Sequence, residues 1–331
     1  MSQPQNEKFP SGRGCLATFV QTTSTIYLVG MVFYLTLRLL FGDGFWWLAL
    51  LNSFAIYTFI PAFFFFFLAL FTRDWRQIIR LGLICLLGIV WFGPFFQAKQ
   101  MLPSTINRTT LNVVTLTLDA NQPDQDAMIE WVIANQPDLV LFQNRPAIFD
   151  EGVPRLQNLL PEQYIHDHSR LTLSRYPVLD ANQDRVIINV YDNQIAVYNV
   201  HFPSPFDHEP RINVPILDVL TRYDESGQRT QIDQLIAKLN QETIPVIVGG
   251  GFNISQHSLL YSHLTLRLRD SFRETNHGLG MTWMANLPLL RSDYIWYGNG
   301  GLRALRSEVG ENVGSYHLPY RALIEIRQAL P

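Results

Sequence analysis

Two long stretches within the first hundred residues of this chain have almost no charge, and this restricts where they can fold. Within residues 14–71 the only charged side chains are Arg38 and Asp43, and residues 81–98 carry none. A helix of about 20 apolar residues is long enough to cross a hydrocarbon core of about 30 Å. We therefore predict a transmembrane region over residues 22–96, with three helices near 22–41, 45–71 and 78–96.

Lysine and arginine side chains predict on which side of the membrane each part lies. Lys8 and Arg13, before the first helix, share a side with the three arginines of residues 73–80, between the second and third helices. Basic residues are enriched in the cytoplasmic segments of membrane proteins. We therefore expect segment 1–21 in the cytoplasm and everything after the third helix on the periplasmic or extracellular side.

The remainder of the chain is acidic. Residues 101–331 carry eighteen basic and twenty-five acidic side chains, whereas residues 1–100 carry seven basic and three acidic ones. Proteins that bind nucleic acids usually present a basic surface to the phosphates, so nucleic acid is not an expected partner. Both cysteines, Cys15 and Cys85, lie in the N-terminal part. The rest of the chain can therefore form neither a disulfide nor a cysteine-ligated metal site.

After a polar linker at residues 97–110, apolar periodicity predicts a mixed α/β domain over residues 111–331. The predicted helices cover residues 124–135 and 228–240. The predicted strands cover residues 111–118, 138–143, 185–191, 194–201, 244–249, 292–297 and 322–327. The short connection at Tyr191–Gln194 predicts a hairpin, so antiparallel as well as parallel neighbours are expected.

One segment, Pro245–Asn253, combines a buried strand with three consecutive glycines and a terminal amide. We expect the glycines to form a tight turn in preference to an anion-binding loop. The segment resembles the Gly-Asp-Phe-Asn signature of the endonuclease/exonuclease/phosphatase superfamily, a group of metal-dependent phosphodiesterases and phosphatases. Here the position of the aspartate is taken by Gly251.

Further segments in matching order extend the resemblance over residues 111–327. They are Pro137–Gln143, Tyr198–His201, Thr282–Trp283, Ser292–Ile295 and Ser315–Pro319. The resemblance implies a four-layer αββα sandwich after the three-helix transmembrane region. The N-terminal helices, with Phe45–Trp47, are similar to those of membrane-anchored bacterial members, which implies a location in a bacterial plasma membrane.

The resemblance also implies a mechanism. In the superfamily a divalent cation binds the phosphoryl group, an aspartate activates water, and a histidine oriented by another aspartate stabilises the transition state. Four matching positions keep the expected residue types: His201, Asn253, Asp293 and His317. Four others do not. Thr117 stands in the position of an asparagine, and Asn144 in that of the principal metal-binding glutamate. Gly251 stands in the position of the water-activating aspartate, and Tyr316 in that of a further aspartate.

These replacements predict an inactive site. Mg²⁺ and Mn²⁺ prefer oxygen ligands, and Asn144 and Tyr316 remove two negative charges from the matching positions. Gly251 offers no general base. We therefore expect no bound cofactor and no competent catalysis by the retained residues. We expect His317 and Asp293 to form a hydrogen-bonded core pair.

The leading hypothesis is a membrane-anchored, catalytically inactive protein that serves as a structural or interaction subunit, with the lipid bilayer and integral-membrane proteins as partners. Two alternatives remain. In the first, the protein is a phosphodiesterase or phosphatase with rearranged metal ligands. Asp119 would contribute to a Mg²⁺ or Mn²⁺ site, or His201 and His317 would bind a softer metal such as Zn²⁺. In the second, the domain binds a phosphate or a lipid head group through the same two histidines.

Overall fold

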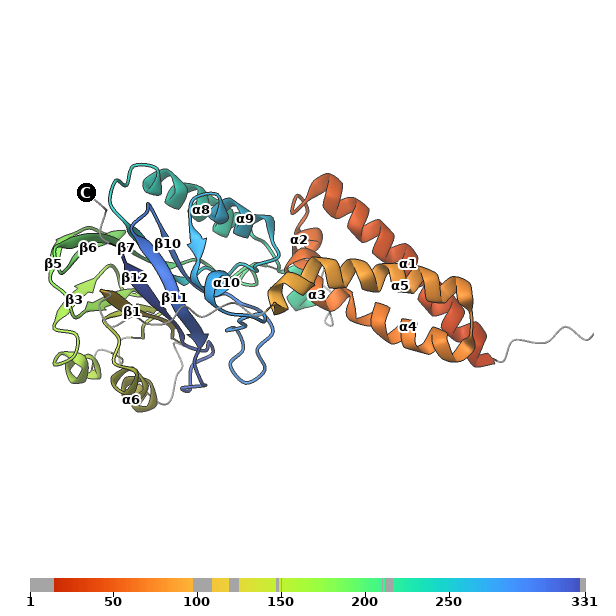
Figure 1. Cartoon of the computed structure of the whole chain (residues 1–331), viewed down its shortest axis with the longest axis horizontal. Helices are drawn as coiled ribbons and strands as arrows, with labels where there is room; N and C mark the ends of the chain where they lie inside the picture. Colours follow the sequence, from red (N-terminus) through yellow and green to blue (C-terminus); the bar gives the residue numbers. More distant parts are fainter. Residues whose placement is uncertain are drawn as a thin grey trace, which may run out of the picture. The chain divides into compact units, whose positions relative to one another are not determined.

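The computed structural model describes residues 15–97, 109–118, 125–146, 149, 151–209, 211 and 217–327. The chain forms two compact units. One consists of Met1–Gly42 and Ala55–Pro94, and the other of Asp43–Phe54 and Phe95–Pro331. Figure 1 shows that the first unit is helical and that the second contains the sheets.

The first unit is a bundle of apolar helices: α1 (Cys15–Phe41), α3 (Ala55–Thr58), α4 (Ile60–Thr72) and α5 (Trp75–Phe92). Leu28, Ala69 and Leu81 are buried where the helices meet. The outward surface is also apolar, since Leu39 and Phe71 are each 85% exposed. Such a surface is unfavourable in water and is suited to lipid. Two segments, Ala17–Phe41 and Trp75–Phe96, are long and apolar enough to span a membrane.

The helix predicted over residues 45–71 is not continuous. It consists of α2 (Trp46–Ser53) and, after a bend of 83°, the segment Ala55–Phe71. If this bent pair is counted as one membrane span, the number of possible spans is three. Polar side chains explain the break, because Asn52 donates to Asp43 and Ser53 to Glu225, both in the globular unit. α2 therefore belongs to that unit and not to the helical bundle.

The globular unit contains two six-stranded sheets. Sheet A has the order β11-β12-β1-β2-β4-β3 and consists of β1 (Thr110–Thr117), β2 (Leu139–Gln143), β3 (Glu162–Ile165), β4 (Leu171–Ser174), β11 (Leu302–Val309) and β12 (Tyr320–Ile326). Sheet B has the order β5-β6-β7-β8-β10-β9 and consists of β5 (Val178–Ala181), β6 (Arg185–Val190), β7 (Asn193–His201), β8 (Val246–Gly251), β9 (Arg269–Asp270) and β10 (Asp293–Gly298). β1 is parallel to β2 and β7 to β8, while the remaining pairs are antiparallel.

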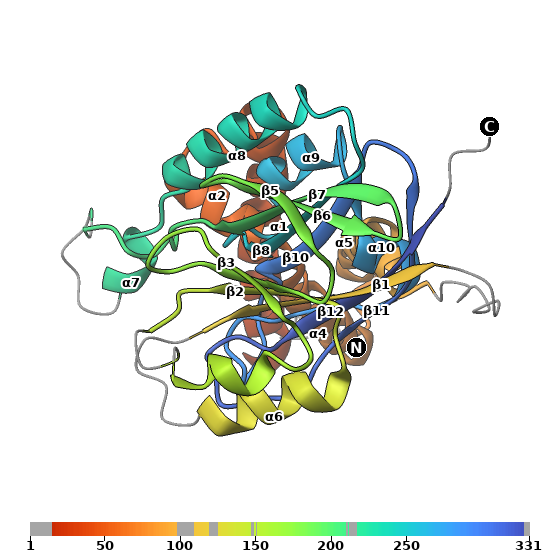
Figure 2. The same cartoon turned by 90° about the vertical axis from the view of Figure 1, so that its left-hand side faces the viewer.

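Helices cover the outer faces of both sheets. α6 (Gln125–Asn135) packs on sheet A through Met128 and Val132, whereas α8 (Ser226–Leu239) and α9 (Leu259–Thr265) cover sheet B. Leu141 and Ile324 belong to the cluster that fills the space between the sheets. Figure 2 shows α8 and α9 on one side of the strands and α6 on the other. This is the predicted αββα sandwich. Shorter elements are α7 (Asp218–Thr221), α10 (Ser271–Thr275), η1 (Gly93–Phe96) and η3 (Val153–Leu156).

All predicted strands and helices of the domain are present, with ends that differ by a few residues, and the hairpin at Tyr191 is confirmed by the pairing of β6 with β7. Most of the predicted linker lies outside the described residues. The predicted glycine turn is wrong, because Gly249 to Gly251 lie in β8 and pair with β7 and β10. Gly250 has a φ of +146°, and a Cβ there would lie 1.9 Å from the carbonyl oxygen of Val200. Glycine is needed for close approach within the strand.

Buried polar groups attach α2 to the globular unit. The Ser53 hydroxyl lies 2.7 Å from that of Tyr223, and Ser255 donates to the carbonyl of Ser53 over 2.8 Å. Asp43 accepts from the backbone N–H of Leu259, the first residue of α9, over 2.5 Å. Because such groups lose their hydration on burial, separating α2 from the domain would leave several of them without partners.

Glu225 is the ionisable group at the centre of this attachment. Its Oε1 accepts from the hydroxyls of Ser53 and Tyr223, while Oε2 is buried with no partner among the described residues. Burial raises the pKa of Glu225 to about 7, and the two hydroxyl donors oppose this only in part. The protonated carboxyl is therefore the form that the folded protein favours.

We expect stability to fall as pH rises through 7, and Glu225→Gln to reduce this dependence. A glutamate with a pKa raised in the folded state contributes stability that is present below its unfolded pKa of about 4.5 and is lost above the folded one. The variant should therefore gain up to about 3 kcal/mol relative to wild type between pH 5 and pH 8. Urea unfolding of the full chain in detergent, followed by tryptophan fluorescence, measures this. Glu130→Gln, at an exposed position, serves as the control, and parallel pH profiles for wild type and Glu225→Gln would contradict the prediction.

Candidate functional site

A cleft of about 300 Å³ collects the residues that the sequence singled out. Strand ends supply Thr117 from β1 and His201 from β7, and the connections after β2 and β8 supply Asn144 and Asn253. Tyr316 and His317, just before β12, complete the set. Gly251 and Asp293 lie at the paired ends of β8 and β10, next to Thr117 and His317. Asp119 is outside the described residues.

Asp293 is the most heavily hydrogen-bonded side chain of this region. Its Oδ1 accepts from the Thr117 hydroxyl over 2.6 Å, and Oδ2 accepts from Thr282 over 2.5 Å, from Ser292 over 2.8 Å and from His317 Nδ1 over 2.7 Å. The side chain is 1% exposed. Both oxygens are therefore already occupied by protein donors, and the predicted pair with His317 is confirmed.

The charge of Asp293 is stabilised by these donors. Burial alone would raise its pKa, but the charge of His317 and the hydrogen bonds from His317, Thr117 and Thr282 outweigh burial, so the pKa lies below the ordinary value. A carboxylate in this state is a poor proton acceptor at neutral pH. It acts on the cleft by orienting the imidazole of His317.

His201 has no comparable partner. Its Nδ1 atom is buried and forms no hydrogen bond with the described residues. Burial lowers the pKa of His201 to about 4, and the nearby His317 adds to the effect. The imidazole is therefore neutral at physiological pH and supplies no positive charge for a phosphate.

The space beside Gly251 is closed by its neighbours. A Cβ at this position would lie 2.8 Å from Thr117 Oγ1, 3.3 Å from His201 Nδ1 and 3.5 Å from Asp293 Oδ1. The first distance is too short for a carbon and an oxygen that do not hydrogen-bond. The Thr117 hydroxyl thus occupies the volume that a side chain at position 251 would need. An aspartate does not fit there without rearrangement.

The two asparagines of the cleft are bonded to backbone. Asn144 Nδ2 donates to the carbonyl of Leu118 over 2.9 Å, and Asn253 Nδ2 donates to that of Phe202 over 2.7 Å. Both residues have left-handed backbone conformations, with φ of 51°, which asparagine tolerates better than most residues. Each amide fixes a loop at the rim of the cleft.

Aromatic side chains form one wall. The ring of Trp283 stacks on Phe206 at a centroid distance of 5.8 Å, and Tyr316 meets the edge of Trp283 at 6.1 Å. Sequence reasoning did not single out Phe206, which packs behind Trp283, or its neighbour Asp207, which lines the cleft. Their loop after β7 has no periodic pattern, although its position at the end of a predicted strand was a usable signal.

The described residues of the cleft do not by themselves form a site for a catalytic divalent metal ion, and Asp119 lies outside them. Among the residues that the structure describes, no three His, Cys, Asp or Glu side chains are grouped so that they could hold one. Asn144 offers only a neutral amide oxygen, Gly251 has no side-chain ligand atom, and both oxygens of Asp293 already accept from protein groups. Mg²⁺ normally needs at least one free carboxylate together with several waters.

Comparison with known families agrees with this fold and with the position of the cleft. The family model described as "Endonuclease/Exonuclease/phosphatase family" matches residues 109–317. The chain therefore belongs to this family. The match spans every cleft position named above. Comparison with curated proteins gave no match.

Solved structures share the fold at low identity. The endonuclease/exonuclease/phosphatase from Bacteroides vulgatus is 18% identical, with a TM-score of 0.50 over 66% of this chain and 100% of its own. The one from Beutenbergia cavernae is 17% identical, with a TM-score of 0.50 over 67% of this chain and 73% of its own. A humanized D. rerio TDP2 with 14 mutations is 11% identical, with a TM-score of 0.51 over 65% of this chain and 99% of its own.

We expect Gly251→Ala to lower the free energy of unfolding by about 1–3 kcal/mol, because the new methyl group meets the Thr117 hydroxyl. In a Thr117→Ala background this oxygen is absent, so the same substitution should cost clearly less. Urea unfolding of the wild type, both single variants and the double variant gives the coupling between the two positions. An equal cost of Gly251→Ala in both backgrounds would show that Thr117 does not occupy this space.

Proposed function

We propose that this protein is a membrane-anchored, catalytically inactive member of the endonuclease/exonuclease/phosphatase family that acts as a structural or interaction subunit. The observation that carries the proposal is the packing around Gly251, where Thr117 fills the volume beside a strand end that lacks a general base. This arrangement is an alternative packing of the site and not merely a missing side chain.

Chemistry supports the same conclusion. Hydrolysis of a phosphate ester in this type of site requires a cation that neutralises the phosphoryl oxygens and a base that accepts a proton from water. The cleft offers a neutral His201, amides bonded to backbone and a carboxylate whose two oxygens both accept from protein donors. Loss of a single oxyanion contact costs about 3–4 kcal/mol of transition-state stabilisation, and the loss here is larger.

Topology supports a three-span anchor. Residues 43–54 belong to the same compact unit as residues 95–331, which supports placing both on one side of the proposed membrane. The chain between them would then leave that side through Ala55–Phe71, without α2, and return through α5. α1 adds one further crossing. The N-terminus and the turn with Arg73, Arg76 and Arg80 then lie together in the cytoplasm, and the domain lies outside a bacterial plasma membrane.

The anchor also supports a role in a membrane complex. Phe64 and Phe67 of α4 are exposed, as are Val29 and Phe33 of α1. Large aromatic and aliphatic surfaces of this kind pack against neighbouring helices as well as against lipid. We therefore propose integral-membrane proteins as the partners.

We expect no metal-dependent hydrolysis. The full chain in detergent, incubated with bis(4-nitrophenyl) phosphate and Mg²⁺ or Mn²⁺, should release nitrophenol no faster than buffer, because the cleft lacks both metal ligands and base. A phosphodiesterase that cleaves this probe is the positive control. Turnover that disappears on chelation would contradict the proposal. If Asp119→Asn also abolished it, the result would favour an enzyme with rearranged ligands.

We expect the protein to leave native membranes as part of a larger assembly. Extraction with a mild detergent, followed by measurement of the particle mass by light scattering, should give a mass clearly above that of one chain with its detergent. A monodisperse monomer from native membranes would argue against a subunit role. Saturable phosphate binding that is lost only when His201 and His317 are both replaced would instead favour a binding module.

A further inference from the structure

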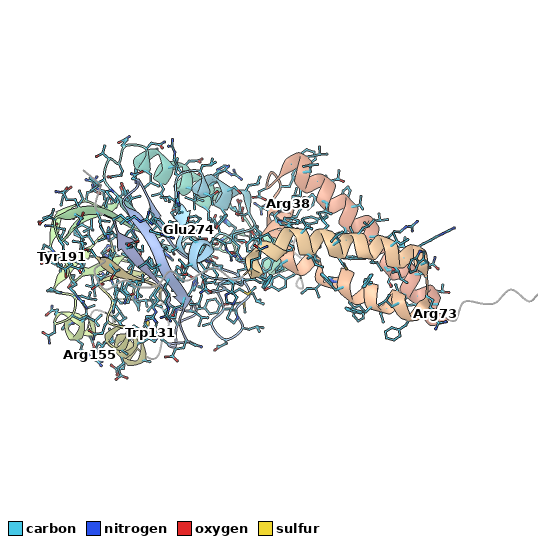
Figure 3. The ribbon with its side chains drawn as sticks, in the orientation of Figure 1. Arg38, Arg73, Trp131, Arg155, Tyr191 and Glu274 are labelled. Carbon is cyan, nitrogen blue, oxygen red and sulfur yellow. The ribbon has the colours of Figure 1, made fainter. Side chains whose placement is uncertain are left out.

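A further cavity lies within the helical unit. It has a volume of about 600 Å³ and is bounded by the start of α1 and by the turn between α4 and α5. Its polar lining includes Gln21, Arg73, Asp74, Arg76, Gln77 and Arg80. Figure 3 shows Arg73 at the end of the bundle, where α4 gives way to α5.

The cavity is strongly basic. Arg73, Arg76 and Arg80 are all exposed and form no ion pair with the residues that the structure describes. The single acidic residue of the described lining, Asp74, caps α5 by accepting from the backbone N–H of Gln77 over 3.4 Å. Three positive charges and one negative charge line the cavity at the N-terminus of α5. The backbone dipole of the helix also favours an anion there.

A buried amide adds a second requirement. Gln77 is only 3% exposed, and its Nε2 donates over 2.7 Å to the hydroxyl of Thr25, which in turn donates over 2.7 Å to the carbonyl of Gln21. This chain of donors fixes the orientation of the amide. Gln77 Oε1 is left buried without a hydrogen-bond partner among the described residues. A ligand that completes the site must therefore bring a donor as well as an anion.

We propose that this cavity, which we call the headgroup site, binds an anionic phospholipid whose phosphate contacts the arginines and whose headgroup hydroxyl donates to Gln77 Oε1. A glycerol headgroup combines one negative charge with hydroxyl donors. The exposed Trp75 is suited to the membrane interface, where such a headgroup lies. The inference rests on the proposed membrane anchoring, and basic residues at a membrane surface are drawn to anionic lipids.

Native mass spectrometry of the full chain in neutral detergent tests the charge requirement. Phosphatidylglycerol should bind at least about tenfold more tightly than phosphatidylcholine, and the triple variant Arg73→Gln, Arg76→Gln, Arg80→Gln should lose this preference. A matched triple variant at Arg155, Arg269 and Arg306, exposed on the globular unit, should keep it. Equal binding of the two lipids, or equal loss in both triple variants, would overturn the proposal.

Phosphatidylmethanol tests the donor requirement, because it has the same charge as phosphatidylglycerol and lacks the headgroup hydroxyls. Wild type should prefer phosphatidylglycerol severalfold, and Gln77→Leu should bind both lipids alike. A preference that Gln77→Leu retains would refute the role of Gln77. Binding of free glycerol phosphate as tight as that of the lipid would overturn the lipid assignment in favour of a soluble phosphate ligand.

Membrane fractionation separates this proposal from the anchoring on which it rests. A chain that appears in the soluble fraction without detergent would refute the anchoring and with it the lipid site. A chain that stays in the membrane fraction but shows no lipid preference would refute the headgroup site alone.

Discussion

Four donors converge on the Asp293 carboxylate, and this interaction determines how the cleft is built. Thr117 comes from sheet A, whereas Asp293 opens β10 of sheet B, so the hydrogen bond between them joins the two sheets at the end where the cleft lies. A fully buried carboxylate is tolerated only when its charge is stabilised by donors such as these. Beneath it, Gln143 donates to Asn199 over 2.7 Å and forms a second polar link between the sheets. The two sheets are therefore joined near the cleft by a buried polar network.

The same network is consistent with the proposed loss of catalysis in a chain that keeps the family fold. Strand ends still deliver His201, Asn253 and His317 to one cleft, because the order and register of the strands place them there. His317 is hydrogen-bonded to Asp293 and Asn253 to a backbone carbonyl, whereas His201 Nδ1 has no hydrogen-bond partner among the described residues. Such bonds stabilise the fold whether or not a substrate is ever bound, since a buried polar group without a partner is costly. Retention of these side chains is thus no sign of catalysis.

The N-terminal region contributes to the globular unit as well as to the proposed anchor. The segment 43–54 lies between two apolar helices in the sequence, yet it packs with the sandwich through Asp43 and Ser53. This attachment limits the possible paths of the chain through a membrane, because residues 43–54 and the domain must share one side. At the other end of the bundle, the basic turn after α4 gathers uncompensated arginines around a buried amide. The two ends of the helical region therefore differ in chemistry, and each suits its proposed surroundings.

Local patterns in the sequence were sufficient to predict the αββα fold, because strand periodicity and apolar runs determine which residues are buried. The segments that match the family identified it and the positions at which this chain differs. The break at Phe54 escaped prediction, since residues 45–71 carry no charge and the polar partners of Asn52 and Ser53 include Glu225, far along the chain. The glycines of β8 were misassigned for a similar reason. Only the position of the neighbouring strand shows that a side chain at Gly250 would collide with the carbonyl oxygen of Val200. Sequence alone also listed the missing catalytic groups. Only the tertiary structure decided that Thr117 fills the space at Gly251, because this contact joins residues that are distant in the chain. It also decided that Thr25 of α1 binds the nitrogen of the Gln77 amide and that the amide oxygen is left unpaired.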